Sequence, residues 1–207
     1  MQFQKIIFNT LKKFKILVID SSPIIYIGLK SIFKNSLVFE VSDYLETAEN
    51  VYEILDNVEI DLIISDLNYR KGSVINLLKK FKKNKTEIPV FLKISPDEDE
   101  ETILKIVNIY KTLKINGLIV TNTSIDKDIL EGCSHDGGIS GKPLFKKSTQ
   151  LLKRIHELDK DIFLVGVGGV FTNEDYENKI RFGASLVQIY TGFIYEGPAI
   201  VKKILSR

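Results

Sequence analysis

Short apolar runs alternate with segments of helical periodicity along most of the chain. The apolar runs predict seven buried strands, at Lys15–Asp20, Val38–Asp43, Leu62–Ser65, Val90–Ile94, Gly117–Thr121, Phe163–Val167 and Leu186–Tyr190. The periodic segments predict helices at Pro23–Lys34, Thr47–Asn57, Gly72–Asn84, within Pro96–Lys114, and at Ser148–Leu158, Asn173–Phe182 and Gly197–Leu205. Such alternation is typical of an α/β fold with a parallel sheet and flanking helices. A closed (β/α)8 barrel would need one strand more.

Two of the predicted helices carry further signals. In Pro23–Lys34 the apolar residues form a stripe at helical spacing, made of Ile24, Ile27, Leu29, Ile32 and Phe33. Thr47 is the expected N-cap of the next helix, because its hydroxyl can accept a hydrogen bond from a first-turn N–H group. His156 lies between charged neighbours on its predicted helix and is expected at the surface.

The N-terminal extension, residues 1–14, allows more than one structure. Its apolar residues fall near helical spacing and lysines lie between them. A short basic amphipathic helix of this kind can bind a membrane surface. The alternatives are a helix packed against the domain and a strand at Phe3–Phe8.

Composition places the chain among globular proteins. It has 207 residues, of which 44% are hydrophobic and 27% charged, enough for one or two domains. A net charge of +2 is too small to argue for nucleic acid as a partner. The single cysteine excludes an internal disulfide and fits a reducing compartment. No long apolar run or signal-peptide core is present, so we expect a cytoplasmic protein, with peripheral membrane association as the alternative.

Glycines and hydroxyl residues follow three successive predicted strands. Gly137–Gly141, Val165–Val170 and Gln188–Gly192 supply them, and Val165–Val170 precedes a predicted helix. Glycine lets backbone N–H groups approach an anion closely, and ligands of parallel α/β folds bind at the carboxyl ends of strands. The pattern therefore predicts a site for a phosphate-bearing cofactor, with ordinary tight turns as the alternative.

Polar residues at two earlier strands extend this site. Lys93 lies inside an apolar strand, where burial would be costly without a partner. Alternation points it toward a strand-end pocket in a barrel, or into solvent from an edge strand. Asn122 closes the next strand, where its amide can bind an imide or a carboxylate of a ligand.

Five blocks of sequence resemble the class 2, quinone-using dihydroorotate dehydrogenases. They are Phe91–Asp97, Asn116–Thr123, Gly137–Leu144, Val165–Val170 and Gly183–Gly192, and they follow the family's order and spacing. The resemblance begins at about Pro89 and implies the second half of a (β/α)8 barrel, residues 89–207.

The resemblance implies FMN as cofactor and assigns roles to individual residues. Lys93 would lie beside the flavin ring. The other cofactor-binding residues would be Thr121, Gly141, Gly168, Gly169, Tyr190 and Thr191, of which Gly169, Tyr190 and Thr191 would hold the phosphate. Asn122 and Thr123 would bind the substrate, dihydroorotate, or the product, orotate. The family transfers a hydride from dihydroorotate to the flavin in pyrimidine biosynthesis, uses a serine base, and passes electrons to quinone.

The family's base segment, Ser-Ser-Pro-Asn, has no match in this chain. Its nearest equivalent is Ser65-Asp66-Leu67-Asn68, in which Asp66 would replace the serine. Asp66 is thus a weak candidate for the catalytic base, and we expect FMN or phosphate binding with impaired catalysis.

Residues 15–88 resemble a response-regulator receiver domain, which is flavodoxin-like. Asp20 follows the first strand, and Asp66 falls where the receiver has its phosphoacceptor. Ser21 replaces the second metal-binding acid, and Thr121 stands where the receiver has a lysine, so no metal site is expected. Cys133 and His135 are two possible ligands only, which do not make a metal site.

The two resemblances together predict one parallel sheet with strand order 2-1-3-4-5-6-7, open or curled toward a barrel. Three domains follow: residues 1–14, 15–88 and 89–207. The chain would then be chimera-like. Its function would be that of a flavin oxidoreductase, a non-catalytic flavin- or phosphate-binding scaffold, or a degenerate receiver.

Overall fold

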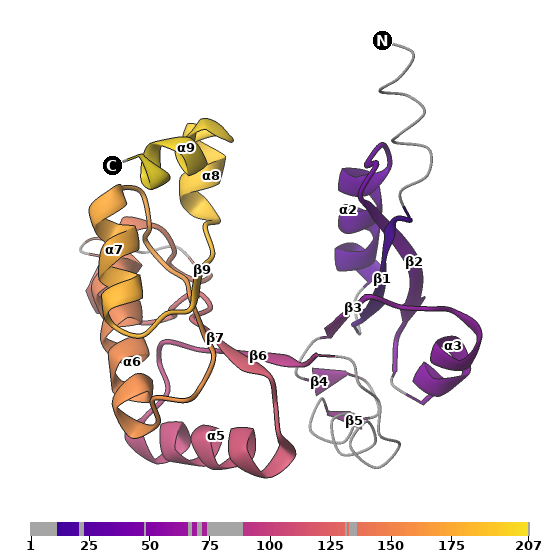
Figure 1. Cartoon of the computed structure of the whole chain (residues 1–207), viewed down its shortest axis with the longest axis horizontal. Helices are drawn as coiled ribbons and strands as arrows, with labels where there is room; N and C mark the ends of the chain where they lie inside the picture. Colours follow the sequence, from indigo (N-terminus) through magenta and orange to yellow (C-terminus); the bar gives the residue numbers. More distant parts are fainter. Residues whose placement is uncertain are drawn as a thin grey trace. The chain divides into compact units, whose positions relative to one another are not determined.

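The computed structural model describes residues 12–20, 23–47, 49–65, 68–69, 72–73, 89–130, 132 and 136–206. The chain divides into two compact units, Met1–Ile88 and Pro89–Arg207 (Figure 1). Each unit has its own parallel sheet. The predictions for the N-terminal extension fall outside the described residues, apart from its last three positions.

The first unit is built on three parallel strands in the order β2-β1-β3. These strands are β1 (Phe14–Ile19), β2 (Phe39–Leu45) and β3 (Leu62–Ser65), and they confirm the first three predicted strands within a residue or two. Ile16, Val18 and Val41 form the buried core. Helix α2 (Pro23–Phe33) packs on the sheet, and α3 (Val51–Asn57) follows β2.

The predicted stripe of α2 is only partly correct. Leu29 and Phe33 pack against the core together with Tyr26, whereas Ile24, Ile27 and Ile32 are exposed. The reason is that Tyr26, Leu29 and Phe33 are spaced by three and four residues and share one face of the helix. The exposed isoleucines lie on the other faces.

Helix α3 begins four residues after the predicted N-cap. Thr47 accepts a hydrogen bond from the N–H group of Glu49 at 3.4 Å, and the capping position is taken by Asn50. Thr47 therefore stabilises a turn before the helix.

The helix predicted at Gly72–Asn84 does not begin at Gly72. Strand β5 (Gly72–Ser73) pairs antiparallel with β4 (Asn68–Tyr69). Glycine is a poor helix former, and backbone pairing with β4 occupies this position instead. The rest of the predicted helix lies outside the described residues.

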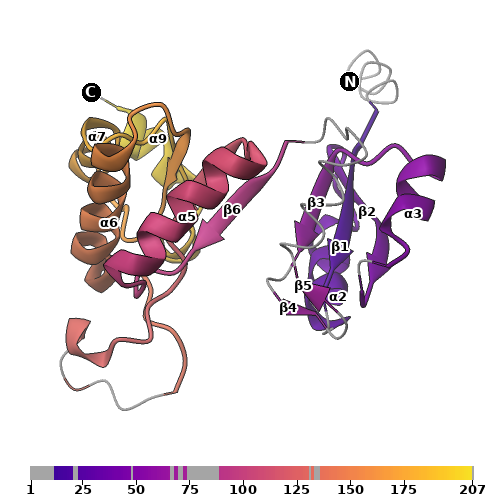
Figure 2. The same ribbon diagram turned by 90° about the horizontal axis from the view of Figure 1, so that it is seen from below.

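The second unit has four parallel strands in sequence order, β6-β7-β8-β9. They are β6 (Phe91–Ile94), β7 (Gly117–Val120), β8 (Leu164–Gly166) and β9 (Leu186–Val187). The helices are α5 (Glu100–Leu113), α6 (Phe145–Leu158), α7 (Asn173–Arg181), α8 (Thr191–Glu196) and α9 (Ala199–Leu205), with short 3-10 turns η1 (Lys127–Ile129) and η2 (Lys142–Leu144). Helices α5, α6 and α7 lie together along one side of the unit, and η1 projects from it (Figure 2).

A continuous apolar core holds these helices on the sheet. Leu118 and Leu164 are fully buried from the strands, and Leu152 and Ile155 are fully buried from α6. His156 is adjacent to them and half-buried, because its ring packs where Gly183 leaves space. The prediction of a surface histidine was therefore wrong.

Polar caps fix the beginnings of two helices. The Asp99 carboxylate accepts a hydrogen bond from the N–H group of Thr102 at 2.8 Å at the start of α5. At the start of α7, Thr172 and Asp175 form a reciprocal capping box. Such caps satisfy first-turn N–H groups that have no partner within the helix.

The single continuous sheet predicted from sequence is not found among the described residues. Strands β3 and β6 belong to different sheets, and β6 pairs with β7. The connection predicted to carry a parallel strand beside β3 begins with the antiparallel β4–β5 pair, and the rest of it lies outside the described residues. Within the described part of the chain, no helix combines the length and apolar character needed to cross a membrane.

Candidate functional site

The carboxyl ends of the four strands of the second unit surround a cavity of about 290 Å³. This volume is at the lower end of the range for small-molecule sites, roughly 300–1,000 Å³. All nine residues predicted for cofactor or substrate binding line it: Lys93, Thr121, Asn122, Thr123, Gly141, Gly168, Gly169, Tyr190 and Thr191. The structure therefore brings together a side chain of strand β6 and residues of the three connections that follow β7, β8 and β9.

The loop after β8 needs glycine at two successive positions. Gly168 and Gly169 have φ angles of 99° and 77°, which are in the region that favours glycine. A Cβ atom at Gly169 would lie 2.5 Å from the Cβ atom of Phe145, the first residue of α6. The loop is thus pressed against the N-terminal turn of α6.

This loop also presents unused backbone donors. The N–H groups of Phe171 and Thr172 donate to Asp175, and that of Val167 donates to the carbonyl of Val120. In contrast, the N–H groups of residues 168–170 have no acceptor among the described residues. Successive N–H groups in a turn of this kind form a concave site for an anion.

Two neighbouring loops close around the same cavity. The Thr191 hydroxyl donates to the Ser140 hydroxyl at 3.1 Å, which joins the start of α8 to the glycine loop before α6. Gly141, with a φ of 75°, approaches the methyl group of Thr191. Hydroxyls and free N–H groups therefore come from three loops at once.

Lys93 lies on β6 at the edge of the cavity. Its side chain keeps access to solvent, yet partial burial lowers its pKa below the usual value. Its ammonium has no hydrogen-bond or ion-pair partner among the described residues. An unpaired cation beside a cavity suits a ligand that carries negative charge.

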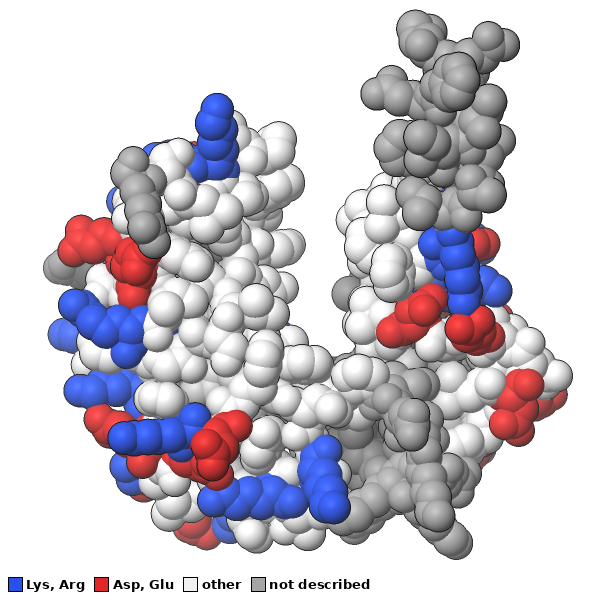
Figure 3. Space-filling view, viewed as in Figure 1, with Lys and Arg blue, Asp and Glu red and all other residues white. Residues whose placement is uncertain are grey.

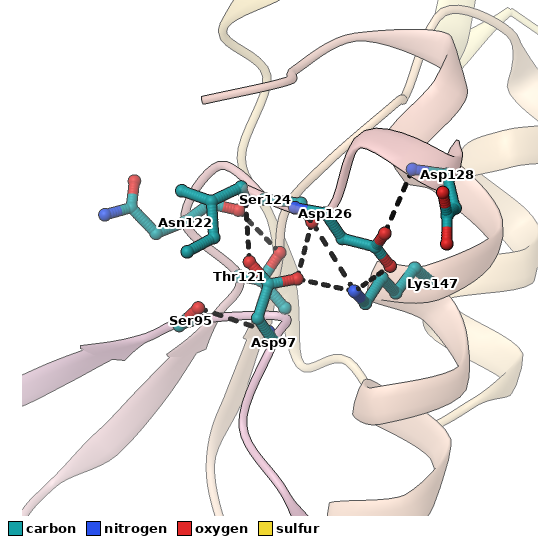
Figure 4. Close-up of polar contacts among 9 residues, drawn as sticks. Ser95, Asp97, Thr121, Asn122, Ser124, Asp126, Asp128 and Lys147 are labelled. Atoms are coloured by element: carbon teal, nitrogen blue, oxygen red, sulfur yellow. Dashed lines mark hydrogen bonds and ion pairs between the residues drawn. The ribbon is translucent and has the colours of Figure 1, made fainter. Parts of the chain in front are cut away.

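A polar network beside the cavity joins three elements (Figure 4). The Asp97 carboxylate follows β6 and accepts hydrogen bonds from the Ser124 hydroxyl at 2.5 Å and from the N–H group of Ile125 at 2.7 Å. Lys147 of α6 donates to Asp97 at 2.5 Å and to Asp126 at 2.8 Å. The network fixes the loop after β7, which carries Asn122 and Thr123, to both β6 and α6.

The charges of this network are shifted by their neighbours. Desolvation acts to raise the pKa of Asp97, but the hydrogen bonds from Lys147, Ser124 and Ile125 outweigh it and lower that pKa. Desolvation acts to lower the pKa of Lys147, but the two carboxylates outweigh it and raise that pKa. Both groups are therefore charged at neutral pH.

Sequence reasoning gave no role to Lys147 or Lys179, and Asp97 entered it only as the last residue of the resembling block Phe91–Asp97. Lys179 of α7 is fully buried, and burial lowers its pKa to about 7. Its position three residues after Tyr176, which also packs inward, was the available signal.

Other predicted residues fall elsewhere. Asp66, Cys133 and His135 lie outside the described residues. Asp20 follows β1 in the first unit.

Figure 3 shows the charged side chains of the second unit interspersed along the flank formed by α5, α6 and α7, with both signs present.

The fold and the cavity define a parallel α/β protein with a strand-end site suited to an anionic group. A family model described as dihydroorotate dehydrogenase matches residues 12–207. The chain therefore belongs to the dihydroorotate dehydrogenase family, and the match is not confined to the second unit.

Individual relatives agree with this assignment. A dihydroorotate dehydrogenase (quinone) of Christiangramia forsetii is 38% identical over 176 residues, which cover 79% of this chain and 52% of the relative. One of Trichodesmium erythraeum is 45% identical over 136 residues, covering 60% of this chain and 36% of the relative. The chain thus spans about half the length of these curated relatives, or less.

Solved structures of the family also match. A dihydroorotate dehydrogenase of Eimeria tenella in complex with ferulenol has a TM-score of 0.53 and 31% identity, covering 67% of this chain and 38% of that one. A ligand-free form from the same organism has a TM-score of 0.64 over 88% of this chain and 63% of that one. At 20% identity, this second likeness shows the fold alone.

These matches give no support to a receiver domain or a chimera. The family model covers residues 15–88, the segment that was compared with a receiver. The order β2-β1-β3 is shared by receivers, but strand order alone does not assign a function.

Proposed function

We propose that this chain binds FMN in the strand-end cavity of its second unit. The observation that carries the proposal is the run of N–H groups at residues 168–170, which have no acceptor among the described residues and line the cavity. Three donors on a glycine loop suit the oxygens of a phosphate. A riboflavin-type ligand without phosphate would leave them unpaired.

The remaining residues suit the other parts of the same ligand. Gly169, Tyr190 and Thr191 would hold the phosphate, and Gly141, Gly168 and Thr121 would contact the cofactor. Lys93 would lie beside the flavin ring, where its unpaired charge favours electron-rich atoms. Asn122 and Thr123 would bind dihydroorotate or orotate. Bound FMN supplies a hydride acceptor to such a site.

We further propose that dihydroorotate oxidation by this chain is slow or absent. The chain lacks the base segment that its resemblance implies, and Asp66 is the nearest substitute. A positioned general base contributes roughly 10²–10⁴-fold to rate. The chain would then act as a flavin-binding member of its family with impaired turnover.

The binding proposal is tested by titrating FMN into the purified chain and following quenching of flavin fluorescence. We expect saturable binding by the wild type and loss of binding in Gly169→Ala. Gly197→Ala is the matched control, since Gly197 has a φ of 69°, no atom within 4 Å of a Cβ, and a position outside the cavity lining. Absence of FMN binding by the wild type, or equal binding by Gly169→Ala, contradicts the proposal.

The catalytic proposal is tested by a steady-state assay with dihydroorotate and a quinone acceptor. Turnover in the range usual for enzymes, about 1–10³ per second, would overturn it. If such turnover is abolished by Asp66→Asn and not by Asp61→Asn, Asp66 is the substitute base.

A further inference from the structure

Lys179 is a buried cation directly beneath the glycine loop. It lies on α7 with no exposed surface, and its stem packs against Gly166 of β8, where a Cβ atom would lie 3.3 Å from two of its carbons. It is not among the residues that line the cavity. The side chain therefore supports the loop from behind and does not touch a ligand in the cavity.

Its ammonium is tied to the loop backbone at two points. It donates to the carbonyl of Val167 at 3.0 Å and to the Ser148 hydroxyl at 2.7 Å. Ser148 in turn lies 3.2 Å from the carbonyl of Gly168. These contacts occupy the carbonyls of Val167 and Gly168. The same two peptide groups carry the unused N–H groups of residues 168 and 169.

Among the described residues, no carboxylate forms a hydrogen bond or an ion pair with this ammonium. The groups that face the ammonium are the Val167 carbonyl at the end of β8, the Ser148 hydroxyl and the ring of Phe145 on α6, 5.2 Å away. The acid whose charge raises the pKa of Lys179 is Asp175 of the same helix. Its carboxylate already accepts hydrogen bonds from the N–H groups of Phe171 and Thr172. Burial of an unneutralised ammonium is costly, and an anion on the far side of the loop would offset that cost.

We propose that Lys179 is a positioning residue that holds the glycine loop in its anion-binding form and, through its charge, makes the site select phosphorylated flavin over unphosphorylated flavin. The proposal rests on the proposed binding of FMN. Lys179 acts through the loop backbone and through the field behind it.

A phosphate bound at the loop also stabilises the protonated form of Lys179. Burial lowers the pKa of the free protein's Lys179 to about 7, so the ammonium is partly deprotonated near neutrality. An anion raises that pKa, and binding therefore takes up a proton. Selection for FMN should weaken as the pH rises above 7 and the ammonium is lost.

The test compares the dissociation constants of FMN and riboflavin for the full chain at pH 7 and pH 9. For the wild type at pH 7 we expect tighter binding of FMN. The selectivity ratio is the dissociation constant of riboflavin divided by that of FMN. In Lys179→Met this ratio should fall by about tenfold or more, because FMN binding weakens while riboflavin binding changes little. Lys153→Met is the matched control, since Lys153 lies on the exposed side of α6, and it should keep the wild-type ratio.

Several outcomes overturn the inference. Equal loss of FMN and riboflavin binding in Lys179→Met would mean a structural role without charge selection, and no change in either would exclude any role. Wild type that binds FMN no better than riboflavin defeats the proposed phosphate site itself, and this is seen before any variant is made. If Lys179→Met does not fold, the wild-type ratio at pH 9 decides: an unchanged ratio between pH 7 and pH 9 contradicts the inference.

Discussion

The ammonium of Lys147 lies 2.5 Å from the carboxylate of Asp97, which is 50 residues away in the sequence. Lys147 is on α6, which lies between β7 and β8 in the sequence, and Asp97 follows β6. The pair therefore joins this helix to the loop after a strand to which the helix is not directly connected. Both side chains are mostly buried. The pair therefore fixes one side of the strand-end cavity.

Asp97→Asn should destabilise the protein by roughly 1–3 kcal/mol, because it leaves a buried cation with one carboxylate and weakens the hydrogen bonds to Ser124 and Ile125. Urea unfolding at pH 7 measures this change. Glu101→Gln is the control, since it removes an exposed pair with Lys105 and should leave the unfolding curve almost unchanged. A loss in Asp97→Asn no greater than in Glu101→Gln would show that the network does not stabilise the fold.

The Asp97 contribution should disappear in acid. The pKa of Asp97 is lower in the folded protein than its usual value of 3.8, so the folded state binds this proton less readily than the unfolded state. The stabilisation is present above about pH 3.8 and is lost as the pH falls through the lowered pKa. The difference in unfolding free energy between wild type and Asp97→Asn should therefore shrink below pH 3.8. A difference that stays constant down to pH 2.5 contradicts the assigned shift.

Lys179 should make the free energy of unfolding depend on pH in the alkaline range, above pH 7. Its pKa is about 7 in the folded protein and 10.5 in its usual state, so between these values the unfolded chain binds more protons. Unfolding free energy should rise with pH across this window, with a slope of at most about 1.4 kcal/mol per pH unit. Lys179→Met lacks this contribution and should show a flatter profile between pH 7 and pH 9.5. Parallel profiles for the two proteins would place the folded pKa of Lys179 near its usual value.

Gly169→Ala should cost more stability than Gly197→Ala. Both positions have a φ near 70–80°, so both substitutions carry the backbone penalty of about 1–2 kcal/mol. Only at Gly169 would the new Cβ atom also meet backbone, 2.7 Å from the Cα atom of Phe145, whereas nothing lies within 4 Å at Gly197. Thermal denaturation of the two variants separates the steric cost from the backbone cost. Equal losses would mean that the loop after β8 can move away from α6 freely.

Sequence alone predicted most of the elements that form the cavity. The alternation of apolar runs and helical segments located β6 to β8 and helices α5 to α7 within a few residues, because periodicity is a local property of the chain. Helix α8 was missed, since the strand predicted at Leu186–Tyr190 ends at Val187 and the chain leaves the ladder to line the cavity. A ligand site at a strand end changes local structure in a way that apolar periodicity does not record.

Sequence by itself determined that this chain is an α/β protein with glycine loops at successive strand ends, since glycine, alternation and motif spacing are read along one dimension. Tertiary structure decided which distant residues meet. The pairing of Asp97 with Lys147 and the burial of Lys179 beneath Gly168 depend on how α6 and α7 pack against β8. A lysine on a helix looks the same in sequence whether it faces solvent or the core, and only packing fixes its charge, its partners and its effect on a bound anion.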